Sequence, residues 1–351
     1  MTFTFSAYVA DRDVDVAFTV AAGETVALLG PNGAGKSTVL GVAAGHLRPD
    51  RSEVVLDGRP LTVTGEEARH AWVAPHDREI ALLAQDPLLF PHLTVVDNVE
   101  FAPRARGVAR SEAHAIARHW LDEVGVGDLA ERRPTQISGG QAQRVAVARA
   151  LAADPRLLLL DEPMAALDVA VTPALRQTLR SVLAERSVIL VTHDALDALL
   201  LADTVIVLDR GRIVEQGPAD DVLTRPRSAF AARIAGLNIL HGTWHDDRVQ
   251  TPDGTTVHGM VDGPDPDDGD TAVAVFSPSA VSLFREPPGG SPRNMLEARI
   301  TEIEPHGGRV RVRAGELSAD VTPQAVAELD LAPGRHIIFS VKATEVAVYR
   351  S

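Results

Sequence analysis

The sequence predicts an α/β domain with a largely parallel sheet, followed by a small all-β domain. Apolar strands alternate with helical stretches over residues 1–236, and a glycine-rich loop directly follows the apolar strand Thr25–Leu29. From about residue 237 the helical pattern fades into short alternating strands. A chain of 351 residues also suits about two domains.

The strands of the first domain are predicted from short apolar runs rich in β-forming residues. Between them lie Ala- and Arg-rich stretches with helical spacing, such as Ser111–Val124 and Gln141–Ala153. Buried strands that alternate with helices favour a parallel sheet, whose ligands lie beyond the carboxyl ends of the strands. The predicted strands are Thr25–Leu29, Leu157–Leu160, Val188–Val191 and Thr204–Leu208.

The second domain, predicted over residues 237–351, contains alternating strands such as Arg309–Ala314 and His336–Ser340. Gly, Pro and Asp separate these strands, which indicates a small OB-like barrel or a sandwich. Gly269–Phe284 aligns without a gap with Gly334–Tyr349, so we predict two tandem repeats at about 237–285 and 291–351. The alternative is that unrelated strands share a similar period.

Composition excludes several classes of protein. The chain has no cysteine, which excludes a disulfide framework, a thiolate metal site and a cysteine nucleophile. No apolar run approaches the ~20 residues that span a bilayer, and the first residues do not resemble a signal peptide. We therefore expect any membrane association to depend on a partner. A formal net charge of −14 argues against binding to nucleic acid.

Lysine is rare in this arginine-rich chain. Of 34 basic residues only Lys36 and Lys342 are lysines. Compositional drift explains most of the arginine but not the two positions where lysine is kept. A compact ammonium group suits a phosphate or a small oxyanion differently from a planar guanidinium group.

A glycine-rich loop, GPNGAGKST, follows the strand Thr25–Leu29 and precedes a helical pattern. This order of strand, loop and helix is the context that confirms a phosphate-binding loop. Backbone N–H groups and the helix N-terminus attract phosphate, the lysine reaches the β- and γ-phosphates, and the serine ligates Mg²⁺. The loop comprises Gly30, Pro31, Asn32, Gly33, Ala34, Gly35, Lys36, Ser37 and Thr38.

Acidic and polar residues follow other predicted strands. Asp161 and Glu162 end the run LLLLDEP, His193 follows Val188–Val191, and Gln85 follows another apolar run. We expect Asp161 to hold Mg²⁺ and Glu162 to activate the attacking water as a general base. His193 is expected near the γ-phosphate, whereas Gln85 is expected to contact Mg²⁺ and the water.

A second helix N-terminus carries Ser138, Gly139, Gly140 and Gln141. An N-terminus of this kind binds anions, yet one nucleotide does not need two such sites in one chain. We therefore predict a head-to-tail homodimer in which these residues cover the γ-phosphate held by the partner. The alternative is an ordinary serine N-cap.

Residues 1–236 resemble the ATP-binding subunits of ABC transporters, through the phosphate loop, Gln85, SGGQ, LLLLDEP, Ala166–Asp168 and His193. The resemblance implies a P-loop NTPase with a RecA-like core and a helical subdomain at about 86–150. It also implies ATP and Mg²⁺ as cofactors, a role for Asp168 at the dimer interface, and a membrane permease as partner. The groove for that permease would be lined by Leu88, Leu89, Phe90 and Pro91.

Two positions depart from the family pattern. The family usually stacks adenine on an aromatic residue upstream of the phosphate loop, where this chain has Arg12 between Tyr8 and Phe18. Arginine is able to stack on a base, but spacing does not assign the position. Ala165 stands where the family usually has serine, which puts the detailed geometry between dimer partners in doubt.

The second domain resembles the molybdate-binding TOBE/Mop module of molybdate-importer ATPases, through SPRNMLEARITEIEP and VKATEVAVY. That resemblance implies a site that binds molybdate or tungstate as a regulatory ligand. The candidate residues are Ser291, Arg293, Asn294 and Lys342. The first repeat has Asn238 and Ser277 at the matching positions but no cation, so we expect it to be structural.

The resulting prediction is the ATPase of a molybdate importer, held peripherally at the cytoplasmic face of the plasma (inner) membrane by its permease and served by a solute-binding protein. Related modules occur on importers of sulfate, polyamines, iron and sugars, so another solute is the main alternative. A soluble ABC ATPase acting on DNA or ribosomes is more remote. The stretch between Gly35 and Ser138 is too short for a long coiled coil, and the chain has one ATPase module.

Overall fold

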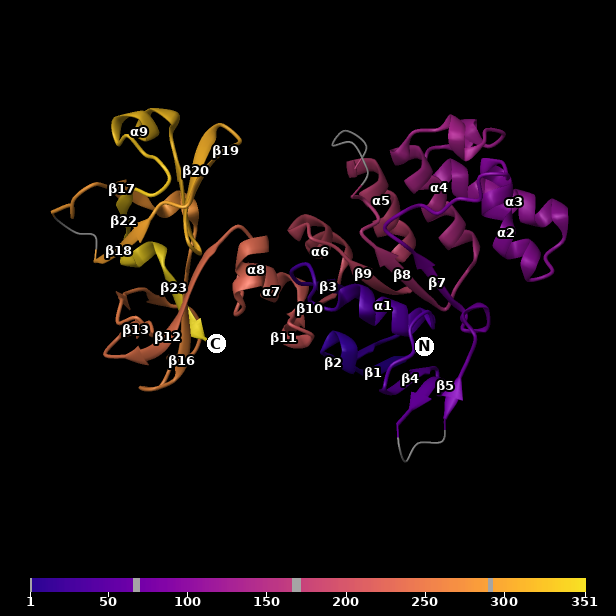
Figure 1. The fold of residues 1–351 in the computed structure, drawn as a ribbon, viewed down its shortest axis with the longest axis horizontal. Helices are drawn as coiled ribbons and strands as arrows, with labels where there is room; N and C mark the ends of the chain where they lie inside the picture. Colours follow the sequence, from indigo (N-terminus) through magenta and orange to yellow (C-terminus); the bar gives the residue numbers. More distant parts are fainter. Residues whose placement is uncertain (1, 66–69, 166–171, 290–292) are drawn as a thin grey trace. The chain divides into compact units, whose positions relative to one another are not determined.

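The chain divides into two units in the structure, which is a computed structural model (Figure 1). Residues 2–65, 70–165, 172–289 and 293–351 are described. The N-terminal unit ends at Val222 and the C-terminal unit begins at Leu223, rather than at 236/237 as predicted. The difference arises because the intervening segment packs on the β unit. The Tyr349 hydroxyl, for example, donates a hydrogen bond to the Pro226 carbonyl at 2.8 Å.

The central sheet of the N-terminal unit confirms the predicted α/β fold. Its strand order is β11-β10-β3-β9-β8-β7, and all neighbouring pairs are parallel except β10 with β11. Every residue of β3 and β9 is buried, as expected for strands covered on both faces. The strands are β3 (Thr25–Leu29), β7 (Ile80–Leu83), β8 (Leu157–Asp161), β9 (Ser187–Val191), β10 (Thr204–Asp209) and β11 (Arg212–Pro218).

A second, antiparallel sheet in the same unit was not predicted. Its strand order is β2-β1-β4-β5-β6. Helix α1 (Lys36–Ala44) lies between the two sheets, because its apolar residues share one core with strands of both. The strands and adjoining turns are β1 (Phe3–Val9), η1 (Ala10–Arg12), β2 (Val14–Val20), β4 (Arg51–Leu56), β5 (Arg59–Thr64), β6 (Ala71–Trp72) and η2 (Pro75–Asp77).

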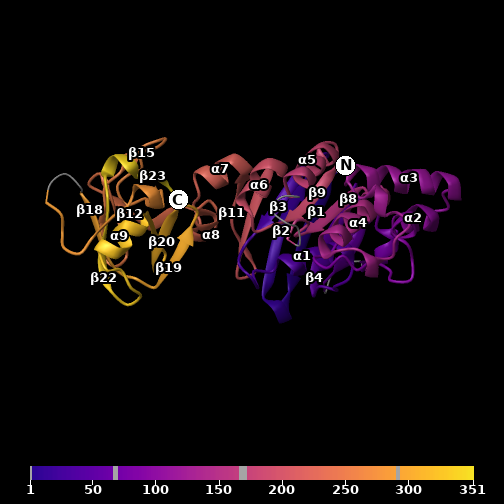
Figure 2. The ribbon, with the colours of Figure 1, turned by 90° about the horizontal axis from the view of Figure 1, so that it is seen from above.

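Helices cover the other face of the central sheet. Their apolar residues form a core with Leu83, Leu158 and Leu190 of the strands. Figures 1 and 2 show α2, α3 and α4 grouped at one end of the unit, within the span expected for a helical subdomain. The helices are α2 (Val95–Ala105), α3 (Arg110–Glu123), η3 (Gly127–Leu129), η4 (Pro134–Gln136), α4 (Gly139–Ala152), α5 (Thr172–Leu183) and α6 (Ala195–Leu201). A further helix, α7 (Ala219–Thr224), follows β11 and contains the point at which the chain divides into its two units. Among the described helices, none combines the length and apolar character needed to cross a bilayer.

The C-terminal unit is built from small β-sheets around one apolar core, as predicted. The sheet orders are β14-β13-β12-β16-β23-β15, β17-β22-β18 and β19-β20-β21. The elements are α8 (Ala229–Ile234), β12 (Asn238–His245), β13 (Arg248–Gln250), β14 (Thr256–Val257), β15 (Met260–Val261), β16 (Thr271–Phe276), η5 (Pro278–Ala280), β17 (Ser282–Phe284), β18 (Asn294–Arg299), β19 (Glu302–His306), β20 (Arg309–Ala314), β21 (Leu317–Val321), α9 (Pro323–Glu328), β22 (His336–Val341), η6 (Ala343–Glu345) and β23 (Ala347–Arg350).

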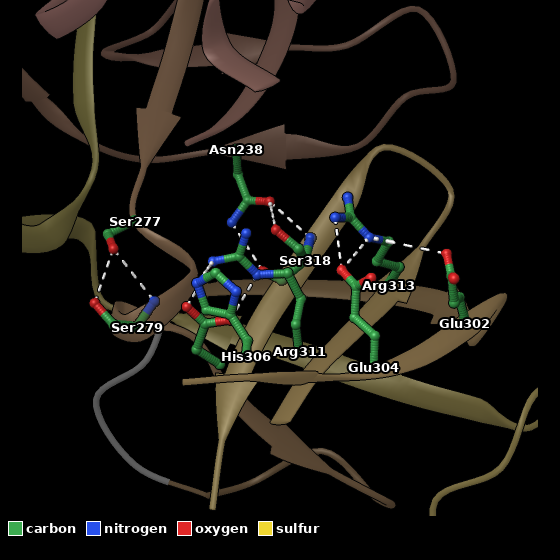
Figure 3. A network of polar contacts seen from close by, with 10 residues as sticks. Asn238, Ser277, Ser279, Glu302, Glu304, His306, Arg311, Arg313 and Ser318 are labelled. Atoms are coloured by element: carbon green, nitrogen blue, oxygen red, sulfur yellow. Dashed lines mark hydrogen bonds and ion pairs between the residues drawn. The ribbon is translucent and has the colours of Figure 1, made fainter. Parts of the chain in front are cut away.

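Two buried asparagines occupy matching places in this unit. The Asn238 amide exchanges two hydrogen bonds with the backbone of Ser318, at 2.9 and 2.7 Å (Figure 3). The Asn294 amide does the same with the backbone of His258, at 2.8 and 2.7 Å. Each asparagine thus joins one predicted repeat to the other. Strands of the two predicted repeats also pair with each other, since β16 pairs with β23 and β17 pairs with β22. Two copies of one unit would produce these equivalences.

The sheet β19-β20-β21 carries ion pairs on one face. Arg311 donates two hydrogen bonds of 2.8 Å to the Asp320 carboxylate, and Arg313 contacts Glu304 at 2.7 Å (Figure 3). The hydrogen bonds from Arg311 lower the pKa of Asp320 below its ordinary value. The arginines of RVRVRA lie on the face of the sheet that carries these acidic partners, and this explains why they alternate with apolar residues.

Candidate nucleotide and anion sites

Glycine is required by the backbone of the phosphate loop. Gly30 and Gly35 have φ values of +152° and +107°, which L side chains rarely adopt. A Cβ atom on Gly30 would lie 2.3 Å from the Leu208 carbonyl oxygen, and one on Gly35 would lie 2.9 Å from a methyl group of Val14. The loop is therefore held against neighbouring residues at the start of α1, where the helix N-terminus attracts anions.

Lys36 lies across this loop. Its Nζ donates hydrogen bonds to the carbonyls of Gly30 at 2.7 Å and Pro31 at 3.0 Å. Burial lowers the pKa of Lys36, while the charges of Glu162 and Asp161 act in the opposite direction. The ammonium group is thus held between the phosphate loop and the acidic end of β8.

Lys36→Ala should weaken the binding of ADP and ATP by roughly 10–100-fold, because it removes a charge-assisted contact to phosphate. Calorimetric titration would measure the Kd values. Arg59→Ala is the control, since it removes an exposed cation that pairs with Glu79. An unchanged nucleotide Kd for Lys36→Ala would contradict the role of this loop.

The three predicted catalytic side chains meet at the ends of neighbouring strands. Gln85 donates from Nε2 to Glu162 Oε2 at 3.3 Å, and His193 Nδ1 lies 3.3 Å from Glu162 Oε1. They follow β7, β8 and β9, whose carboxyl ends share one edge of the sheet. Glu162 has a φ of +49°, in the left-handed region that a side chain occupies only when its surroundings hold it there.

Oxygen donors suitable for Mg²⁺ lie beside this cluster. Asp161 precedes Glu162, and burial and then the charge of Glu162 raise the pKa of Asp161. The two adjacent carboxylates repel each other, and a divalent cation held by Asp161 would relieve that repulsion. The Ser37 hydroxyl is exposed at the start of α1. Hydroxyl, carboxylate and amide oxygens are the ligands Mg²⁺ prefers, so the residues fit the ion.

A buried ion pair behind His193 was not predicted. Arg176 of α5 donates from Nε to Asp197 of α6 at 2.7 Å. Asp197 also accepts from the Thr192 hydroxyl at 3.4 Å, and this hydroxyl accepts from the Asp194 N–H at 3.1 Å. The network therefore fixes the turn that carries His193. No spacing in the sequence marks this pair, because Arg176 and Asp197 lie on different helices.

Ser138 is an N-cap in this chain. Its hydroxyl accepts from the Gln141 N–H at 3.3 Å, and its own N–H donates to the Gln141 side chain at 2.9 Å. Ser138 and Gly139 are exposed at the start of α4, and Gly140 follows them within the helix. The cap and the predicted contact with a partner's nucleotide are compatible. Asp168 lies outside the described residues.

The residues predicted to line a permease groove differ in their exposure, and Phe101 lies beside them. Leu88 is 68% exposed and Phe101 is 51% exposed, whereas Leu89 packs against the core. The rings of Phe90 and Phe101 lie 4.7 Å apart. Pro91 is exposed beside them. Phe101 was not among the predicted residues, because it lies within α2 rather than in the loop before it.

The predicted anion ligands do not all meet. Lys342 lines a pocket of about 530 Å³ together with four serines, Phe284, Ala280 and Glu345. Arg293 is exposed and is not part of that lining. Asn294 has a different role from the one expected, because its amide is occupied by the His258 backbone. Ser291 lies outside the described residues. The serines are Ser277, Ser279, Ser282 and Ser340.

Ser277 is the residue of the first repeat that matches Lys342 of the second. We expected the first repeat to be structural, yet Ser277 shares the pocket with Lys342. Its hydroxyl lies 2.8 Å from that of Ser279 (Figure 3). The pocket therefore combines hydroxyl groups from the first repeat with the ammonium group of the second.

Comparison with known proteins agrees with both units. Residues 14–165 match the family described as ABC transporter, and residues 290–348 match the TOBE domain. The molybdenum import ATP-binding protein ModC of Mycobacterium tuberculosis is 50% identical over 359 residues, covering 98% of this chain and 96% of that protein. The molybdate/tungstate import ATP-binding protein WtpC of Pyrococcus horikoshii is 33% identical over 349 residues, covering 95% of both.

A solved structure supports the fold of the N-terminal part. The dimeric structure of a post-hydrolysis state of the ATP-binding cassette MJ0796, bound to ADP and Pi, is 28% identical with a TM-score of 0.54. The match covers 62% of this chain and 99% of that one. The chain therefore belongs to the ABC transporter family of import ATP-binding proteins and carries a TOBE domain in its C-terminal unit.

Proposed function

We propose that this chain is the ATP-hydrolysing subunit of a molybdate importer, coupling ATP + H₂O → ADP + phosphate to uptake through a separate permease. The meeting of Gln85, Glu162 and His193 beside the lysine-bearing phosphate loop carries the hydrolytic part of the proposal. The 50% identity to a molybdenum import protein over nearly the whole chain supports the solute.

Each catalytic side chain has a distinct task. Glu162 accepts a proton from the attacking water, and its hydrogen bond from Gln85 and its contact with His193 orient the carboxylate. Lys36 and the loop N–H groups bind the β- and γ-phosphates. Ser37, Asp161 and the carbonyl oxygen of Gln85 would hold Mg²⁺, which neutralises phosphate charge when bound.

The nucleotide site is completed by a second copy of the chain. Ser138, Gly139, Gly140 and Gln141 would cover the γ-phosphate in the partner, head to tail, and Asp168 would lie at the same interface. The exposed N-terminus of α4 supports this role, since it presents N–H groups and a positive dipole end. The related cassette MJ0796 is described as dimeric with ADP and Pi.

The apolar surface formed by Leu88, Phe90 and Phe101 is the docking site for the permease. Exposed apolar residues grouped in this way are typical of a partner surface. The protein would then lie at the cytoplasmic face of the plasma (inner) membrane, held peripherally, with a solute-binding protein supplying the permease. A net charge of −14 is consistent with the absence of a nucleic-acid partner.

The pocket at Lys342 is a regulatory site for molybdate or tungstate. One ammonium group and several hydroxyl donors suit a divalent tetrahedral anion, although the Glu345 carboxylate in the same lining opposes it. Arg293 lies outside this lining, so Lys342 is the cation of the proposed site. Sulfate has the same shape and charge, so a sulfate importer is the closest alternative.

Calorimetric titration with molybdate, tungstate and sulfate tests this site. The wild-type chain should bind molybdate and tungstate more tightly than sulfate, and Lys342→Ala should lose most of that binding. Arg248→Ala is the control, since its cation pairs with Asp246 on the surface of the same unit. Stronger binding of sulfate would favour the sulfate importer. Unaltered binding in Lys342→Ala would remove this residue from the site.

A further inference from the structure

The turn between β1 and β2 is fixed beside the phosphate loop. Arg212 contacts the Asp13 carboxylate at 3.0 Å, and the Asp15 N–H donates to the Gly211 carbonyl at 2.8 Å. Gly211 in turn donates to the Ala34 carbonyl of the phosphate loop at 3.1 Å. The turn Ala10–Arg12 is therefore tied through the β10–β11 turn to the loop that holds phosphate.

Three side chains near this turn are candidates for contact with a nucleotide, and two are already engaged. Phe18 is 6% exposed, and its ring stacks on Phe5 at 5.1 Å. The Tyr8 ring is covered by the guanidinium group of Arg51 at 4.6 Å. Arg12 is exposed, and its Nη1 donates to the Thr38 hydroxyl at 3.1 Å. Arg12 is thus the candidate that reaches the phosphate loop.

Strand order shows which part of the nucleotide lies near Arg12. Gln85, Glu162 and His193 follow β7, β8 and β9, on one side of β3 in the sheet. The β1–β2 turn is anchored to β10 and β11, on the other side of β3. The γ-phosphate must face the catalytic side chains, so the α-phosphate and nucleoside extend toward Arg12.

We propose that Arg12 is a nucleotide-binding residue whose guanidinium group contacts the α-phosphate of ADP or ATP. Thr38 belongs to the loop whose backbone surrounds the α- and β-phosphates, and Arg12 already donates to its side chain. The neighbouring acid Asp13 is paired with Arg212. Among the described residues no carboxylate forms an ion pair with Arg12, and its hydroxyl partner is uncharged, so a phosphate oxygen would be a better partner for its guanidinium group.

Nucleotide titrations of Arg12 variants test the proposal. Arg12→Ala should raise the Kd of ADP about tenfold, and raise those of GDP and CDP by the same factor, because the α-phosphate is common to all three. Arg12→Lys should recover most of the affinity, and the effect should shrink at high salt. In ATP hydrolysis KM should rise while kcat stays the same, as for a contact made equally in ground and transition states.

Arg59→Ala is the matched control, because Arg59 is an exposed cation at the far end of the same antiparallel sheet. Two outcomes would overturn the proposal. In the first, Arg12→Ala weakens the binding of purine nucleotides only, and affinity is recovered by Arg12→Trp but not by Arg12→Lys. That result would show that Arg12 contacts the base rather than the α-phosphate. In the second, Arg12→Ala lowers the melting temperature of the nucleotide-free protein but leaves the Kd values unchanged. That result would show that the hydrogen bond from Arg12 to Thr38 stabilises the fold and does not serve nucleotide binding.

Discussion

Glu162→Gln is expected to slow ATP hydrolysis by roughly 10²–10⁴-fold, the range typical of general-base catalysis. Glutamine keeps the size of the side chain and its ability to accept from Gln85, but it cannot take a proton from water. The substitution would also remove the negative charge that lies 3.3 Å from His193 Nδ1. Steady-state phosphate release, measured for the purified chain or the assembled transporter, provides the rate.

Binding should survive the same substitution. The phosphate loop and Lys36 are unchanged, and the like-charge neighbour that raises the pKa of Asp161 is removed. ATP should therefore accumulate on the variant and favour the proposed dimer, which size-exclusion chromatography with and without ATP would detect. Glu112→Gln on α3 is the control, because Glu112 is exposed and remote from the nucleotide. Near-normal turnover in Glu162→Gln would show that another group accepts the proton.

The phosphate loop and the catalytic strands were predictable because each is a local pattern. A five-residue apolar strand followed by a glycine-rich loop places Lys36 without reference to the remainder of the chain. The meeting of Gln85, Glu162 and His193 followed from a general property of parallel sheets, in which strand ends share an edge. The antiparallel sheet was missed, since β1 pairs with both β2 and the more distant β4.

Errors arose where a side chain's partner lies far along the chain. Asn294 has the right chemistry for an anion, but its amide is bound to His258, a neighbour only in the folded unit. Helix α8 looks like a continuation of the α/β pattern, yet Ala232 is buried against Ile239 and Tyr349 of the β unit. The buried pair of Arg176 and Asp197 joins two helices and has no spacing that identifies it.

Arg78→Met should destabilise the N-terminal unit by roughly 3–5 kcal/mol, because it leaves several buried acceptors without a donor. Arg78 has an exposed fraction of 0%. Its guanidinium group donates to the carbonyls of Val42 and Ala43 at 3.1 Å, to the Val73 carbonyl at 2.9 Å and to the Thr62 hydroxyl at 2.8 Å. Every partner is neutral, and burial lowers the pKa of Arg78 to about 10, so it stays charged at neutral pH.

The position of this cation explains its importance. Val42 and Ala43 lie in the last turn of α1, where the helix dipole favours positive charge. The Val42 carbonyl also accepts from the Gly45 N–H at 3.1 Å. The opposite end of α1 is the phosphate loop. Gly45, which ends the helix, leaves space for the guanidinium group, since a Cβ atom there would lie 2.4 Å from Arg78 Nε. Arg78 therefore fixes the far end of the helix that presents Lys36.

Thermal unfolding measures the effect. A loss of this size should lower the melting temperature of a unit of this length by about 6–20 °C. Arg59→Met is the control, because it removes an arginine that is exposed rather than buried. Arg78→Lys should recover only part of the stability, since an ammonium group cannot reach partners on three sides as a planar fork does. A melting temperature unchanged by Arg78→Met would mean that water replaces the guanidinium group at the end of α1.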